Sequence, residues 1–118
     1  MKLTKIHDLL ETEIIYQSQS ELNIVSACGA DLMSDVLAFS KEKTLLLTGL
    51  TNPQVVRTAE MIDLELIIFV RGKQPPKETI ALAEEQDITL LTTEKPLYEA
   101  CGILYSSGLK PEKLNTIE

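Results

Sequence analysis

The feature that most constrains this chain is a unit of strand, short loop and helix that occurs four times in succession. The expected strands begin near residues 22, 44, 64 and 88, so one unit is about 20–24 residues long. Two of these strands contain unbroken apolar runs, at 45–47 and 66–70. Such runs are typical of strands buried on both faces, as in a parallel sheet covered by helices on each side. The pattern therefore predicts an α/β fold, a three-layer α/β/α sandwich.

The boundaries of the expected elements follow from apolar runs, turn residues and helix caps. We expect strands at 22–27, 44–48, 64–70 and 88–92, and helices at 31–40, 53–62, 75–85 and 96–106. An amphipathic helix at 2–12 and a strand at 13–17 precede them, which gives a mostly parallel sheet of about five strands. Gly108 and Pro111 end the last helix. The prediction is one domain over residues 1–108 and a polar C-terminal tail over 109–118.

Composition and charge exclude several classes of partner. The 118 residues carry a formal net charge of −7, which argues against binding to nucleic acid or to anionic lipid. No apolar run approaches the roughly 18–20 residues of a membrane span, and charged residues come too early for a secretory signal. We therefore expect a cytoplasmic protein in which Cys28 and Cys101 are free thiols.

The loops that follow the four strands are the first candidate binding site. Parallel strands bring these loops to one edge of the sheet, where open α/β folds bind their ligands. Helix N-termini and basic side chains there suit a small anion such as a nucleotide phosphate. The alternative is that the glycines serve tight turns and the asparagine caps a helix. The candidate ligand-binding residues are Gly29, Asp31, Thr48, Gly49, Asn52, Arg71 and Lys73.

Side chains for catalysis are scarce. The sequence has one histidine, His7, and contains neither a Gly-x-x-x-x-Gly-Lys-[Ser/Thr] phosphate loop nor a Gly-x-Gly-x-x-Gly fingerprint. Asp31 and Asp35 fall four residues apart on one face of the expected helix, but a hard cation needs more oxygen ligands than these two supply. The simpler interpretation is that Asp31 caps the helix and Asp35 complements its dipole. We expect no catalytic residue, no metal and no cofactor.

The helix at 96–106 is the second candidate site, because it is apolar nearly all round. A helix of this kind is covered on more than one side. Tyr98, Cys101 and Tyr105 form one stripe along it, and tyrosine is favoured at protein interfaces. The helix at 31–40 is similarly apolar, and plain core packing would explain either helix. We favour a homodimer with Tyr98, Cys101 and Tyr105 at the interface.

Four stretches of the sequence carry a resemblance to a known family: residues 27–35, 45–53, 75–84 and 88–93. They resemble the DRTGG domain family, and the match extends over about residues 2–108. The domain is similar to the N-terminal domain of HPr kinase/phosphorylase and also occurs beside CBS domains in some pyrophosphatases. The Asp-Arg-Thr-Gly-Gly signature that names the family is absent from this sequence.

The resemblance implies an α/β sandwich without catalysis of its own, and a regulatory or assembly role that often involves dimerisation. The kinase activity of HPr kinase belongs to a separate phosphate-loop domain, whose motif this sequence lacks. Our first hypothesis is thus a non-catalytic regulatory or protein-interaction module that dimerises and takes a protein partner. The alternative is a sensor domain that binds a nucleotide or another small anion at the loops after the strands.

Overall fold

A computed structural model describes residues 1–38 and 43–111, which form six strands and five helices. The strands are β1 (Glu13–Tyr16), β2 (Ser26–Gly29), β3 (Thr44–Thr48), β4 (Leu66–Phe69), β5 (Thr89–Thr92) and β6 (Lys110–Pro111). The helices are α1 (Leu3–Leu10), α2 (Met33–Leu37), α3 (Pro53–Met61), α4 (Lys77–Gln86) and α5 (Leu97–Ser106). No helix in these ranges is both long and apolar enough to cross a membrane.

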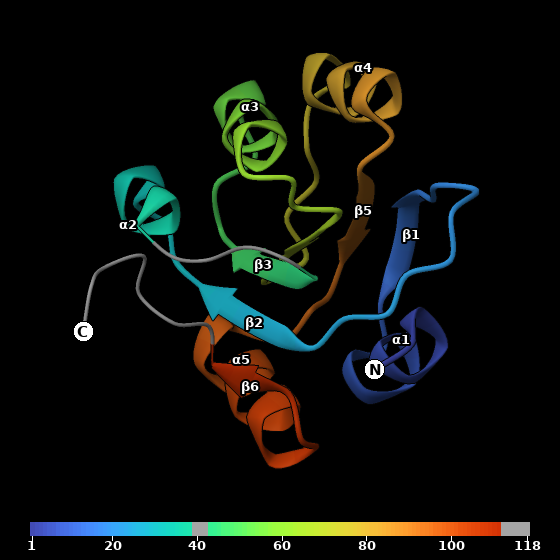
Figure 1. Cartoon of the computed structure of the whole chain (residues 1–118), viewed down its shortest axis with the longest axis vertical. Coiled ribbons are helices and arrows are strands. Elements are labelled where there is room, and N and C mark those ends of the chain that lie inside the picture. The colour runs from blue at the N-terminus through green and yellow to red at the C-terminus, as the bar shows by residue number, and fades with distance from the viewer. Residues whose placement is uncertain (39–42, 112–118) are drawn as a thin grey trace.

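The strands form one sheet in the order β1-β5-β4-β3-β2-β6, and every pair except β1 with β5 is parallel. Helices α2, α3 and α4 cover one face of this sheet, and α1 and α5 cover the other (Figure 1). The prediction of a three-layer α/β/α sandwich with a mostly parallel sheet is confirmed. Strands β2 to β5 lie side by side in chain order, so each crossover helix returns the chain to the neighbouring position.

The two cores lie on opposite faces of the central strands. Along β3, Leu45 and Leu47 pack against the layer of α1 and α5, whereas Leu46 packs against the layer of α2, α3 and α4. All residues of β3, β4 and β5 are buried. Burial on both faces is the reason that these strands are uniformly apolar or carry small threonines instead of alternating with charged residues.

The boundaries of β2 and α2 differ from the prediction. The strand at 22–27 is wrong by several residues, because Ser26 to Gly29 are the residues that pair with β3. Leu22 and Ile24 are buried in the core beside α1 without belonging to the strand. Helix α2 begins at Met33 and not at residue 31, while residues 39–40 of the expected helix lie outside the described part of the chain. The remaining predicted boundaries agree with the structure to within two residues.

The predicted polar tail begins too early. Leu109 is buried in the core against α5, and Lys110 and Pro111 form β6, which pairs with Ser26 and Ala27 of β2. A proline can occupy β6 because an edge strand leaves one row of backbone groups unpaired by the sheet. The folded region thus includes residues 109–111, and residues 112–118 of the expected tail lie outside the described ranges.

Candidate functional site

The loops after β2, β3, β4 and β5 lie at one edge of the sheet, as the sequence predicted. The chain leaves β4 for α4 on one face and leaves β5 for α5 on the other. A change of face between neighbouring parallel strands opens a crevice at their carboxyl ends, which is where α/β proteins place ligands. The loops at 70–76 and 93–96 border this point.

Four of the seven candidate ligand residues come together at this edge. The Asp31 carboxylate accepts a hydrogen bond from the Thr48 hydroxyl (3.0 Å) and another from the Gly49 amide (2.8 Å). A Cβ atom built on Gly49 would lie 3.6 Å and 3.7 Å from the two Asp31 carboxylate oxygens and 3.7 Å from Lys73 Nζ. Asp31, Thr48, Gly49 and Lys73 therefore surround one small volume, which we call the Asp31 cluster.

The hydrogen bonds of the Asp31 cluster change the interpretation of this edge. The prediction that Asp31 caps a helix and shares its face with Asp35 is wrong, because Leu32 is the N-cap of α2 and Asp31 precedes it. Its side chain turns to β3 instead, where it accepts the donors of Thr48 and Gly49. These are donors that a bound phosphate would use. A ligand anion at this point must therefore compete with the chain's own carboxylate.

The other three candidate ligand residues occupy separate places. Gly29 belongs to β2, and a Cβ atom on it would lie 2.6 Å from Cys101 Sγ, so its role is to make room for α5. Asn52 is the N-cap of α3 as expected, but its side chain makes no capping hydrogen bond with any residue that the structure describes. Arg71 lies in the turn after β4 with φ +56°, followed by Gly72 with φ +65°.

Hydrogen bonds join the turn after β4 to the loop after β5. The amide of Arg71 donates to Lys95 O (3.0 Å), and the amide of Gly72 donates to Thr93 O (2.7 Å). The Glu94 carboxylate rests against Gly72, and a Cβ atom on Gly72 would collide with Glu94 Oε2. Sequence reasoning missed Glu94 at this point of the loop edge. The signal that could have found it is Gly72, because a glycine with positive φ also permits close approach by a neighbouring loop.

Helix α5 carries the predicted interface stripe on its outer side. Tyr98 is 92% exposed and Tyr105 is 69% exposed, whereas Cys101 between them is half-buried. Glu99 is the one charged residue of α5, and its carboxylate lies 3.6 Å from Lys95 Nζ. The inner side of the helix packs Ala100 and Leu104 into the core. One side of this apolar helix is thus covered by the sheet, and the other is open.

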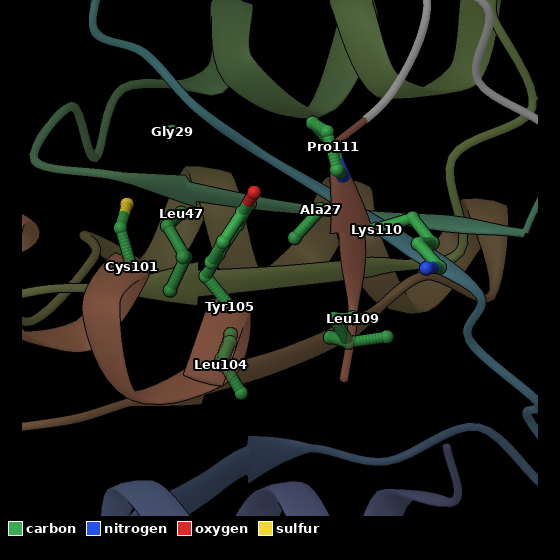
Figure 2. A pocket seen from close by; sticks show the side chains of 9 residues that line it. All are labelled: Ala27, Gly29, Leu47, Cys101, Leu104, Tyr105, Leu109, Lys110 and Pro111. Carbon is green, nitrogen blue, oxygen red and sulfur yellow. The ribbon is translucent and has the colours of Figure 1, made fainter. Parts of the chain in front are cut away.

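A cavity of about 180 Å³ lies between α5 and the edge of the sheet at β2 and β6 (Figure 2). Burial raises the pKa of the Cys101 thiol above its ordinary value, which keeps it protonated and weakens it as a nucleophile. Sequence reasoning missed this cavity, because three of its nine lining residues come from the segment assigned to the tail. Its lining residues are Ala27, Gly29, Leu47, Cys101, Leu104, Tyr105, Leu109, Lys110 and Pro111.

The ionisable side chains within residues 1–38 and 43–111 do not gather into a metal site. No group of three or more His, Cys, Asp or Glu side chains in these ranges could hold a metal ion. His7 lies on α1, where its Nδ1 is 2.7 Å from the Thr12 hydroxyl. Tyr16 donates a hydrogen bond to Asp87 (2.6 Å), which raises the pKa of Tyr16 and lowers that of Asp87. This pair joins β1 to the end of α4.

The fold and the site define a class: a three-layer α/β domain with an open loop edge and one exposed apolar helix. No protein-family model matches the chain, and no curated protein matches it. Its fold is similar to the solved structure of the CBS and DRTGG domains of the regulatory region of a Clostridium perfringens pyrophosphatase, complexed with its activator diadenosine tetraphosphate. The TM-score is 0.71 at 19% sequence identity, and the match covers 98% of this chain and 52% of that one.

The likeness confirms the prediction of a DRTGG-like domain at the level of the fold. This chain spans about half the length of the pyrophosphatase structure that it matches. That structure belongs to a regulatory region and not to a catalytic one. The similarity to the N-terminal domain of HPr kinase/phosphorylase stays a prediction, as does the expected cytoplasmic location.

Proposed function

We propose that this chain is a non-catalytic regulatory module that assembles as a homodimer through the outer side of α5. The observation that carries the proposal is the exposure of two tyrosines on one helix, Tyr98 at 92% and Tyr105 at 69%. Tyrosine exposes a large apolar ring to water, which is costly unless a partner covers it. The similarity in fold to a pyrophosphatase regulatory region supports the regulatory part of the proposal.

Charge favours a second copy of the chain at α5. Two copies that each carry a net charge of −7 repel one another. Their contact is least opposed where the surface carries no net charge. Helix α5 meets this condition, because its one charged residue, Glu99, is paired with Lys95. The depletion of charge and the presence of aromatic side chains are both typical of an interface centre.

The test is the mass in solution, measured by light scattering across a concentration series. We expect twice the 13.1 kDa of the single chain. Tyr98→Glu should return the mass to that of one chain with unchanged circular dichroism, because it would bury an unpaired carboxylate. Met61→Glu is the matched control, since Met61 is 70% exposed on α3 in the opposite layer. A wild type that stays at 13.1 kDa, or a Tyr98→Glu variant that stays dimeric, would refute the proposal.

A second candidate function is the sensing of a nucleotide at the loop edge. The observation that favours it is the nucleotide activator bound to the pyrophosphatase region of similar fold. The Asp31 cluster supplies Lys73 for a phosphate, but the Asp31 carboxylate holds the amide and hydroxyl donors. A nucleotide phosphate would take those donors only by displacing a like charge.

This candidate makes a distinctive prediction for thermal unfolding with added diadenosine tetraphosphate. A ligand that binds the folded state raises the unfolding temperature. We expect the shift to disappear in Lys73→Ala and to grow in Asp31→Asn, which removes the competing charge. Lys2→Ala is the control, because Lys2 pairs with Glu21 outside the loop edge. If the wild type shows no shift in unfolding temperature, or if Lys73→Ala keeps the full shift, the loop edge does not bind this nucleotide. If Asp31→Asn lowers the shift, the Asp31 carboxylate does not compete with the nucleotide.

A further inference from the structure

The interface stripe on α5 is nearly symmetric about its own midpoint. Tyr98 and Tyr105 are seven residues apart, which is about 10.5 Å along a helix and close to two full turns. The midpoint falls between Cys101 and Gly102. A second α5 that runs antiparallel across this midpoint would place its Tyr105 opposite Tyr98 and its Tyr98 opposite Tyr105. A single two-fold axis would therefore bring both tyrosines of each copy against the other copy, as an isologous dimer requires.

Gly102 allows the two helices to approach closely at that axis. Apart from its two neighbours in the chain and the backbone of α5 itself, a Cβ atom built on Gly102 would meet no described atom within 4 Å. The position is therefore on the open side of α5 and presents backbone alone. A glycine at a crossing point lets two backbones come together without the spacing that a side chain imposes.

The cavity beside α5 is of the right size and position to receive a tyrosine ring. It shares Cys101 and Tyr105 with the outer side of the helix (Figure 2). Its volume is about 180 Å³, and an apolar cavity of about 150 Å³ accommodates a benzene ring. Ala27, Leu104 and Leu109 supply an apolar wall, while the exposed Lys110 can donate a hydrogen bond to a phenolic oxygen.

We infer that, in the proposed homodimer, each copy inserts the ring of Tyr98 into the cavity of the other copy, across a two-fold axis at Gly102. The inference rests on the proposed function, since it needs a dimer on α5. The cavity of each copy is then part of the interface, and the ring of Tyr98 from the other copy fills it. This explains why Tyr98 is 92% exposed while a cavity of one ring's size lies open on the same side of the sheet.

The first test fills the cavity from within. Ala27 lines it from β2, and Ala27→Leu adds three carbon atoms that the 180 Å³ can hold. We expect this variant to keep its fold and to weaken dimerisation at least tenfold, measured by analytical ultracentrifugation. Leu32→Ala is the control, because it removes apolar surface that is 60% exposed beside α2 on the opposite face. It should leave the dimer unchanged.

The second test locates the axis and does not depend on the cavity variant folding. In a Cys101→Ser background, Gly102→Cys should form an intermolecular disulfide under copper-phenanthroline and air, because equivalent residues at a two-fold axis meet at disulfide distance. Met61→Cys in the same background should remain monomeric on a non-reducing gel. The gel measures covalent dimer directly, so it needs no assumption about the affinity.

The outcomes separate this inference from the proposed function. A wild type that is monomeric at every concentration refutes both. A dimeric wild type whose affinity survives Ala27→Leu, or whose Gly102→Cys variant gives no cross-link, refutes the inserted ring or the axis and leaves the dimer standing. Weakened association in Ala27→Leu together with a cross-link at Gly102→Cys supports the inference. If Ala27→Leu does not fold, the cross-link at Gly102→Cys decides.

Discussion

The buried hydroxyl of Thr93, the residue that follows β5, joins α1 to the end of that strand. Its Oγ1 donates a 2.6 Å hydrogen bond to Leu10 O, the last carbonyl of α1, and accepts a weaker one from the Lys95 amide at 3.3 Å. Thr93 is 1% exposed. Thr93→Val preserves the shape of the side chain and removes both hydrogen bonds, so it isolates the contribution of the hydroxyl.

The expected loss of stability follows from the burial of the acceptor. An unsatisfied buried carbonyl costs about 1–3 kcal/mol, whereas the Lys95 amide lies at a loop that water reaches and adds little. We expect Thr93→Val to lower the free energy of unfolding by about 2 kcal/mol. An unfolding entropy of about 2.1 cal/mol/K per residue gives about 0.25 kcal/mol/K for the chain of 118 residues. The midpoint of thermal unfolding should therefore fall by about 8 °C.

Urea denaturation followed by circular dichroism measures this loss. Thr93→Ser keeps the hydroxyl and removes one methyl group, so it should lose only about 0.8 kcal/mol. Thr4→Val is the matched control for the exchange of a hydroxyl for a methyl group, because Thr4 is exposed on α1. The reasoning fails if Thr93→Val lies within about 0.5 kcal/mol of the wild type. It also fails if Thr93→Ser loses as much as Thr93→Val.

Two further predictions concern the ends of the sheet. The pKa of Asp87 is lowered by hydrogen bonds, first from Tyr16 and then from Ser18. A lowered folded-state pKa gives stability that is complete above the ordinary value of 3.8 and is lost as the pH falls through the folded value. The urea midpoints of wild type and Asp87→Asn should thus differ at pH 6 and approach one another as the pH falls below 3.8; a gap that stays constant as the pH falls would contradict this. Gly72→Ala should lower the free energy of unfolding by about 1–2 kcal/mol, because φ is +65° and the Glu94 carboxylate must move. Gly102→Ala, at a helix position with open space in the single chain, should not destabilise when unfolding is measured at a concentration where the chain is monomeric, and equal losses in the two variants would contradict the prediction.

The sequence predicted the central elements well, because their signals are local. The run at 44–48 matches β3, and Asn52 followed by Pro53 marks the start of α3. The errors occur at the β2 and β6 side of the sheet. Strand β2 is displaced towards Gly29 because its residues pair with β3, and β6 is only two residues long, which leaves no periodicity to detect.

The candidate site was predictable in position and not in detail. Parallel strands bring their carboxyl ends together, so the approach of Asp31, Thr48 and Lys73 follows from topology alone. That Asp31 accepts the donors of Thr48 and Gly49 depends on where its side chain turns, and no sequence pattern specifies that direction. The cavity at α5 could not be predicted from the sequence for a similar reason, because it depends on the return of Leu109 and Pro111 to β2.

The helices that cover the two faces of the sheet are made at different stages of synthesis. Strands β2, β3 and β4 can associate with α2, α3 and α4 as each leaves the ribosome, since every pairing is with the next strand along the chain. The opposite face of the sheet is only partly covered until α5 has been made. This face carries Leu45, Leu47, Leu66 and Ile68. A nascent chain that has reached only residue 96 therefore displays a water-exposed apolar sheet face that α1 alone cannot cover. An exposed apolar face of this kind is prone to aggregation, so we expect the solubility of the nascent chain to depend on residues 97–111.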